Sequence, residues 1–153
     1  MLWNEDRYQV SLPWKDGILE PETNMEMAKK RLISLEKRFA SEKILKKEYT
    51  QIIDDYVRKS YIRRLNETEM LQTKWWVPHF PVIRRDKETT KVRLVFDAAA
   101  KVQGSSLNDF LETGPKLQRD IVEVILRFRK HKVALVSDVS EMYLQIRVKP
   151  EDR

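Results

Sequence analysis

The chain has 153 residues, of which 41% are hydrophobic and 35% charged, so its length suits one ordinary domain with a modest core. It contains no Cys, only 2 His and only 3 Gly, which excludes a disulfide framework, thiolate metal sites, a cysteine nucleophile and glycine-rich phosphate loops. Any metal site must therefore use carboxylate and carbonyl oxygens, which favour Mg²⁺ or Mn²⁺.

Neither a membrane span nor a secretory signal is predicted. The longest aliphatic run covers only residues 133–136, and the first six residues have neither a basic region nor an apolar stretch. We therefore expect no contact with membranes and an intracellular location.

The net charge of +6 is unevenly distributed. Residues 21–64 carry 12 basic and 7 acidic side chains, net +5, whereas residues 1–20 are net −2 and residues 65–153 net +3. A basic excess of this kind indicates either a polyanionic partner or simply the solvated face of helices.

The basic segment is predicted to form two amphipathic helices, because apolar residues recur at helical spacing. Pro21 with Thr23 or Asn24 makes a plausible start, and a short polar link near Ser41 favours an antiparallel pair. The two apolar stripes are Met25, Ala28, Leu32, Leu35 and Phe39, then Leu45, Tyr49, Ile52, Ile53 and Tyr56.

From Trp75 the pattern becomes extended. Residues 75–83 are apolar and interrupted by prolines, residues 84–91 are polar, and Val92, Leu94 and Phe96 alternate with other side chains, which predicts a β-hairpin with a charged loop.

Further elements are predicted between residue 107 and the last residues of the chain. These are a short helix around residues 107–111, a helix after Asp120 that carries Ile121 to Phe128, a buried strand at residues 132–137 and an extended run at residues 143–148. The fold class predicted from the whole pattern is α+β.

Asp138 is the strongest candidate for a metal-binding residue, because it directly follows the predicted strand at residues 132–137. A carboxylate on a short turn at a strand end is well placed to hold a divalent cation. However, residues 138–141 (DVSE) also match a capping-box pattern, so Asp138 has an alternative role as a helix cap.

Other candidates also have two interpretations. Arg93 on the alternating strand either protects a sheet edge or binds phosphate, and Asp97, which closes the same strand, is open to pairing with a neighbouring cation. Tyr143 is either a core residue or a ligand contact, and the adjacent Trp75 and Trp76 either stack on bases or pack under the hairpin. His79 has no metal-ligand partner at suitable spacing.

Several segments, taken in order, carry a pattern that is far more specific than any one motif. They are residues 76–83 (WVPHFPVI), 90–98 (TKVRLVFDA), 106–109 (SLND), 114–117 (GPKL), 126–130 (LRFRK) and 138–146 (DVSEMYLQI). Their order and spacing strongly resemble reverse transcriptases of BEL/Pao-type LTR retrotransposons. Residues 7–15 (RYQVSLPWK) and the two predicted helices look like the segment that precedes the polymerase in those polyproteins.

The resemblance implies roles for individual residues in two-metal nucleotidyl transfer. Asp138 matches the first catalytic aspartate, a ligand of Mg²⁺ or Mn²⁺, and Val139 matches the residue whose carbonyl binds the nucleotide-associated metal. Tyr143 matches the aromatic residue that excludes a ribose 2′-hydroxyl. Arg93 resembles the fingers arginine that meets the triphosphate, with Lys91 assisting. Asp97 matches an acid that ends the fingers strand, and Gln145 lies on the strand after the first aspartate without an implied role.

The resemblance also divides the chain into residues 1–70, a helical lead-in, and residues 71–153, the fingers and the first palm strands of a right-hand polymerase. The family's Tyr-x-Asp-Asp motif, which supplies the other catalytic carboxylates, does not occur in this sequence. We therefore expect a fragment that is inactive alone. In the full-length protein the implied partners are an RNA/DNA template–primer, dNTPs and the remaining palm, thumb and RNase H regions, in a cytoplasmic particle or the nucleus.

A non-enzymatic alternative stays open. In that interpretation, residues 21–64 form a basic helical module that binds nucleic acid or a partner protein, in a domesticated or decayed element, and the β part is scaffold.

Overall fold

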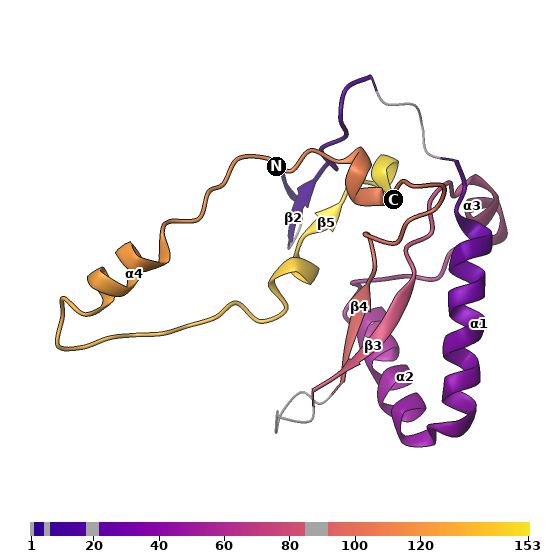
Figure 1. Ribbon diagram of the computed structural model, residues 1–153, viewed down its shortest axis with the longest axis horizontal. Helices are drawn as coiled ribbons and strands as arrows, with labels where there is room; N and C mark the ends of the chain where they lie inside the picture. Colours follow the sequence, from indigo (N-terminus) through magenta and orange to yellow (C-terminus); the bar gives the residue numbers. More distant parts are fainter. Residues whose placement is uncertain (1, 5–6, 18–21, 85–91) are drawn as a thin grey trace. The chain divides into compact units, whose positions relative to one another are not determined.

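The computed structural model describes residues 2–4, 7–17, 22–84 and 92–153, and its helices and strands make a mixed α+β architecture, as predicted (Figure 1). Two compact units divide the chain. We call Pro13–Glu112 the central unit, and Met1–Leu12 together with Thr113–Arg153 the terminal unit. These limits differ from the division near residue 70 that the resemblance implies, which concerns polymerase subdomains and stays a prediction.

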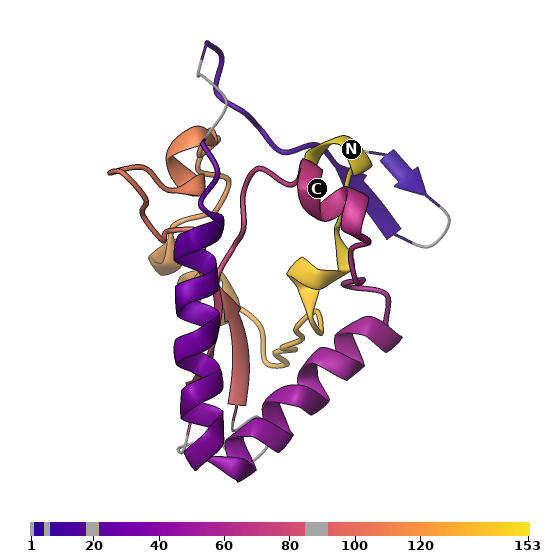
Figure 2. The same cartoon turned by 90° about the vertical axis from the view of Figure 1, so that its right-hand side faces the viewer.

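Two helices dominate the central unit. They are α1 (Met25–Ser41) and α2 (Lys43–Arg58), and Glu42 alone separates them, next to the predicted link at Ser41. The predicted apolar stripes are confirmed only where the helices meet, because Leu35 of α1 and Leu45 and Tyr49 of α2 are buried, whereas Met25 and Leu32 of the first stripe are exposed. Figure 2 shows α2 leaving the end of α1 at an angle, so the two helices pack closest near their junction.

The predicted hairpin is also confirmed. Strand β3 (His79–Ile83) pairs antiparallel with β4 (Val92–Phe96), in a register that places His79 opposite Phe96 and Ile83 opposite Val92. Most of the predicted charged loop, residues 85–91, lies outside the described residues. Along β4 the side chains alternate, because Val92 and Leu94 are buried while Arg93 between them is exposed.

The core of the central unit lies between these helices and the hairpin. Val92 and Leu94 join the buried residues of α1 and α2 in one cluster, which is extended by partly buried apolar residues. The alternation of β4 therefore has a direct physical cause, since one face of the hairpin meets the helices and the other meets solvent. The partly buried members are Phe39, Ile52, Ile53 and Tyr56.

Side-chain hydrogen bonds fix the segments around this core. Asn24, which precedes α1, is 1% exposed, and its carboxamide binds the backbone of Trp76 rather than the N-terminus of α1. The short α3 (Glu67–Gln72) begins with a capping box in which Asn66 and Glu69 bind each other's backbone N–H groups.

The last part of the central unit is irregular apart from one short helix. The predicted helix after the Gly104 turn is confirmed as the 3₁₀ turn η1 (Leu107–Phe110). Trp75 lies half-buried with its ring edge against Phe110, at a centroid distance of 5.7 Å. Packing is therefore the observed role of Trp75, but its partner is Phe110 of η1 rather than the hairpin that the sequence predicts.

The terminal unit contains a small sheet that sequence reasoning did not predict. Its order is β1 (Leu2–Asn4), β2 (Arg7–Val10) and β5 (Arg147–Val148), with β1 antiparallel and β5 parallel to β2. The 3₁₀ turns η2 (Met142–Gln145) and η3 (Pro150–Asp152) flank β5, and the Asp152 carboxylate accepts a hydrogen bond from the Leu12 backbone N–H at 3.0 Å.

The predicted helix after Asp120 is confirmed as α4 (Ile121–Phe128), and the Asp120 carboxylate caps it by accepting from the Val122 N–H at 2.8 Å. An amphipathic helix normally packs its apolar side against a core, but every residue from 112 to 143 is exposed. The apolar side chains of α4 therefore cover no core among the described residues.

The prediction of a buried strand at residues 132–137 is wrong. This segment has no strand and is exposed, with Val133 at 77% and Leu135 at 89% exposure. A strand needs a neighbouring strand for its backbone hydrogen bonds, and no described residue supplies one here. The extended run predicted at residues 143–148 is confirmed only at Arg147–Val148, because residues 142–145 form η2 instead.

Candidate functional site

The predicted site residues lie in both units. Arg93 and Asp97 belong to the central unit, whereas Asp138, Val139 and Tyr143 belong to the terminal unit. The members of each group are close together along the chain. Lys91, the second predicted phosphate contact, lies outside the described residues.

Strand β4 positions Arg93 on the solvent face of the hairpin, opposite Val82 of β3. Its guanidinium makes no ion pair within the described part of the chain, so its donors are available to an anionic ligand. An exposed strand arginine serves equally to protect an edge, and both interpretations of Arg93 remain compatible with its position.

Asp97 has a partner that the sequence did not reveal. Its carboxylate accepts a hydrogen bond from Arg31 of α1 at 2.6 Å, while its backbone N–H donates to the Pro78 carbonyl at 2.7 Å. Asp97 therefore ties the end of β4 both to α1 and to the residue before β3. An acid and a base 66 residues apart carry no local sequence signal, which is why this pair was missed.

Asp138 lies in an irregular, exposed segment, with no hydrogen bond or ion pair to any other described residue. The capping interpretation is wrong, because Glu141 rather than Asp138 precedes the next helical turn. The carbonyl of Glu141 accepts from the backbone N–H of Leu144 at 2.8 Å, and its left-handed backbone (φ 53°) turns the chain into η2.

Val139 precedes this turn, and Tyr143 lies within it. Val139 is 61% exposed, and Tyr143, on η2, is 84% exposed. The interpretation of Tyr143 as a core residue is therefore wrong within the described structure. Gln145 ends the same turn and is half-buried. Asp138, Val139 and Tyr143 thus share one exposed stretch, in which none of them has a structural role that competes with ligand contact.

A metal site is not complete within residues 2–4, 7–17, 22–84 and 92–153. Nowhere in this part of the chain do three or more His, Cys, Asp or Glu side chains lie close enough to hold a metal ion. The oxygen donors of Asp138 suit Mg²⁺ in kind, but a single carboxylate does not make a site. Two-metal chemistry would require further carboxylates.

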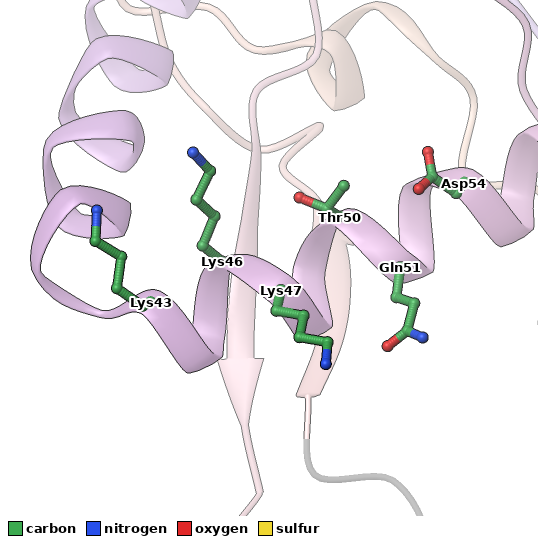
Figure 3. A pocket seen from close by; sticks show the side chains of 6 residues that line it. All are labelled: Lys43, Lys46, Lys47, Thr50, Gln51 and Asp54. Carbon is green, nitrogen blue, oxygen red and sulfur yellow. The ribbon is translucent and has the colours of Figure 1, made fainter.

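Sequence reasoning also missed a pocket on α2. Figure 3 shows it lined by polar side chains of that helix alone, three of them lysines. The signal was present, because Lys43 and Lys47 are four residues apart and Lys46 lies between them, which places the three on neighbouring parts of the helix surface. The lining residues are Lys43, Lys46, Lys47, Thr50, Gln51 and Asp54.

His79 makes a half-buried polar contact that joins β3 to α2. Its Nδ1 shares a hydrogen bond with the Tyr49 hydroxyl at 2.5 Å, and the two rings stack with centroids 5.9 Å apart. Burial raises the pKa of Tyr49 to about 12 and lowers the pKa of His79 below its ordinary value. Both groups are therefore neutral near pH 7, and they hold α2 against β3.

No protein-family model, curated protein or solved structure matches this chain. The described helices include none that is both long enough and apolar enough to cross a bilayer.

Proposed function

We propose that this chain forms the fingers and the first part of the palm of an RNA-directed DNA polymerase similar to the BEL/Pao-type reverse transcriptases, preceded by a helical lead-in. One observation of the fold supports this proposal most directly. The first two motif segments of the resemblance, residues 76–83 and 90–98, pair with each other as the β3–β4 hairpin, and Arg93 is exposed on it.

In this proposal the residues of the chain bind and orient the nucleotide. Arg93, assisted by Lys91, contacts the triphosphate through charge-assisted hydrogen bonds. Tyr143 excludes nucleotides with a 2′-hydroxyl by steric contact. Asp138 and the carbonyl of Val139 contribute oxygen ligands for magnesium, which when bound would activate the primer 3′-hydroxyl and stabilise charge at the α-phosphate.

The exposure of the apolar side chains between residues 121 and 139 also supports the proposal. Val136 is 85% exposed and Leu126 is 65% exposed, and contiguous apolar surface of this kind is normally covered by protein. The remaining palm of a polymerase would supply both that cover and the missing carboxylates. Template–primer and dNTPs are the partners of the complete protein.

Primer extension tests this function. The 153-residue chain should show no magnesium-dependent extension, whereas the protein continued through a Tyr-x-Asp-Asp motif should extend a primer on an RNA template. Within the continued protein, Asp138→Asn should abolish extension. The matched control is Asp120→Asn, which makes the same chemical change at a helix cap and should retain activity.

Two results would overturn the proposal. The first is extension by the 153-residue chain itself, and the second is near-normal extension by the Asp138→Asn variant.

A second candidate function is non-enzymatic. The helices of the central unit carry lysines that have no acidic partner among the described residues, which favours a module that binds a polyanion or an acidic protein surface. This candidate requires neither Asp138 nor Tyr143. It predicts binding that decreases steeply with salt and that depends on the lysines of the helices, and the absence of primer extension by the continued protein distinguishes it from the polymerase.

A further inference from the structure

The solvent face of α2 concentrates positive charge. Lys43, Lys46 and Lys47 lie within its first turn and a half and are exposed. In Figure 3, Lys43 and Lys46 extend to one side of the helix, whereas Lys47 extends to the other. Thr50, Gln51 and Asp54 also line this pocket. Its lining therefore contains three cationic side chains and one anionic side chain, that of Asp54.

Lys43, Lys46 and Lys47 differ from several paired cations of the two helices, although Lys29, Lys30 and Lys37 of α1 likewise make no hydrogen bond or ion pair with a described residue. Arg31 pairs with Asp97, Arg38 with Glu42, and Arg58 and Lys59 both pair with Asp55. In contrast, Lys43, Lys46 and Lys47 make no hydrogen bond or ion pair with any residue that the structure describes. Their charge is therefore not neutralised within the described fold.

The helix itself does not account for this charge. Positive side chains near a helix N-terminus oppose the macrodipole, and acidic residues are favoured there instead. The first turn of α2 contains no acidic residue, and Glu42 at the N-cap makes no side-chain cap. Helix stability alone would favour a different sequence, which indicates that the lysines serve an external ligand.

The chemistry of the face identifies the class of ligand. The apolar side of α2 is occupied, because Leu45 and Tyr49 are buried in the core, and the exposed Ile44 and Val57 lie near opposite ends of the helix, so they form no continuous apolar side to insert into a bilayer. Thr50 and Gln51 add hydrogen-bonding groups beside the cations. At a rise of about 1.5 Å per residue, Lys43 and Lys47 are separated by about 6 Å along the axis, comparable with two nucleotide steps at about 3.4 Å each.

We propose that the solvent face of α2, formed by Lys43, Lys46, Lys47, Thr50 and Gln51, binds the phosphate backbone of nucleic acid without sequence preference. Asp54 at the edge of the face opposes this binding by repelling phosphate. The inference does not depend on the polymerase proposal, because α2 carries none of the residues to which nucleotide chemistry is assigned.

Fluorescence anisotropy with a labelled DNA duplex and the full chain tests the inference. The variant Lys43→Gln/Lys46→Gln/Lys47→Gln should bind at least about tenfold more weakly at low salt. Its slope of log affinity against log salt should decrease by about 2 to 3, because each duplex phosphate contact contributes about 0.9. Circular dichroism of the variant establishes that the helices persist.

Matched controls separate this face from general charge effects. Lys101→Gln/Lys116→Gln/Lys132→Gln removes the same charge from exposed lysines outside α1 and α2 and should bind nearly as well as the unmodified chain. In addition, Asp54→Asn should strengthen binding about two- to fivefold, whereas Glu112→Gln, also exposed, should not.

Equal losses in the two triple variants would overturn the inference, as would unchanged binding after Asp54→Asn. If the chain bound phosphatidylserine vesicles but not the duplex, that result would also overturn the inference, in favour of a membrane surface as the ligand. Duplex binding is measured without nucleotides or primer extension. The binding inference can therefore hold where the polymerase proposal fails, and the polymerase proposal can hold where the binding inference fails.

Discussion

Asn24 and Trp76 exchange two hydrogen bonds across the central unit. The Asn24 carboxamide nitrogen donates to the Trp76 carbonyl at 2.7 Å, and the Trp76 backbone N–H donates to the carboxamide oxygen at 2.6 Å. A side-chain amide thus pairs with a peptide group much as one strand pairs with another. Because Asn24 is fully buried, this pair fixes the start of α1 to the segment before β3 in a place that water does not reach.

We expect Asn24→Ala to lower the free energy of unfolding by roughly 2–4 kcal/mol, because it leaves both the N–H and the carbonyl of Trp76 buried without partners. Urea unfolding followed by tryptophan fluorescence measures the change. The control is Asn108→Ala, an exposed asparagine whose side chain makes no hydrogen bond among the described residues, and it should change stability by less than about 0.5 kcal/mol. Equal effects of the two substitutions would contradict a structural role for the Asn24–Trp76 pair.

The pair formed by Tyr49 and His79 predicts loss of stability at both ends of the pH range. The pKa of His79 is depressed in the fold, so the contribution of the neutral imidazole is complete above the ordinary pKa and is lost as pH falls through the folded value. The pKa of Tyr49 is raised to about 12, so its contribution is complete below about pH 10 and is lost as pH rises from there toward 12.

Tyr49→Phe separates the two effects. It removes the hydroxyl and should cost about 1–2 kcal/mol at neutral pH, because the half-buried His79 Nδ1 loses its hydrogen-bond partner. The variant should also lose less stability than the parent chain between about pH 10 and 12, where ionisation of the Tyr49 hydroxyl no longer contributes. Urea unfolding across pH measures both quantities, and an unchanged alkaline slope in the variant would contradict the assignment.

Glu69 should titrate far below an ordinary glutamate. The guanidinium of Arg63, together with the Asn66 backbone N–H, lowers its pKa to about 2. The contribution of this carboxylate to stability is therefore present above the unfolded pKa and is lost as pH falls toward 2. NMR titration of the Glu69 side chain measures the value directly. Arg63→Gln should raise it toward the ordinary range, whereas Arg64→Gln, which removes the adjacent charge, should move it little.

Much of the central unit could be predicted from the sequence because its signals are local and periodic. The stripes of α1 and α2 and the alternation of β4 around Arg93 follow directly from which side chains meet the core. Contacts between distant segments could not be predicted this way. Neither Arg31 with Asp97 nor Tyr49 with His79 has any fixed spacing that marks the partner.

The terminal unit was harder to predict, for a different physical reason. An apolar run such as residues 132–137 specifies burial but not the partner that provides it, and no described residue covers this run. The parallel pairing of β2 with β5 joins segments more than a hundred residues apart, so no local sequence pattern predicts this pairing. The exposed positions of Asp138 and Tyr143 follow from the same lack of cover.

Tyr143 provides the sharpest test of nucleotide selection in the proposed polymerase. Its side chain is 84% exposed, so replacing it should leave the described fold intact and isolate an effect on the ligand. In the protein continued through a Tyr-x-Asp-Asp motif, Tyr143→Ala should reduce discrimination between deoxynucleotides and ribonucleotides by about 10- to 100-fold, because the ring would no longer oppose the 2′-hydroxyl. Tyr143→Phe keeps the ring and should preserve discrimination. Single-nucleotide incorporation with dNTPs and NTPs measures both, and equal discrimination in the alanine and phenylalanine variants would remove Tyr143 from the nucleotide site.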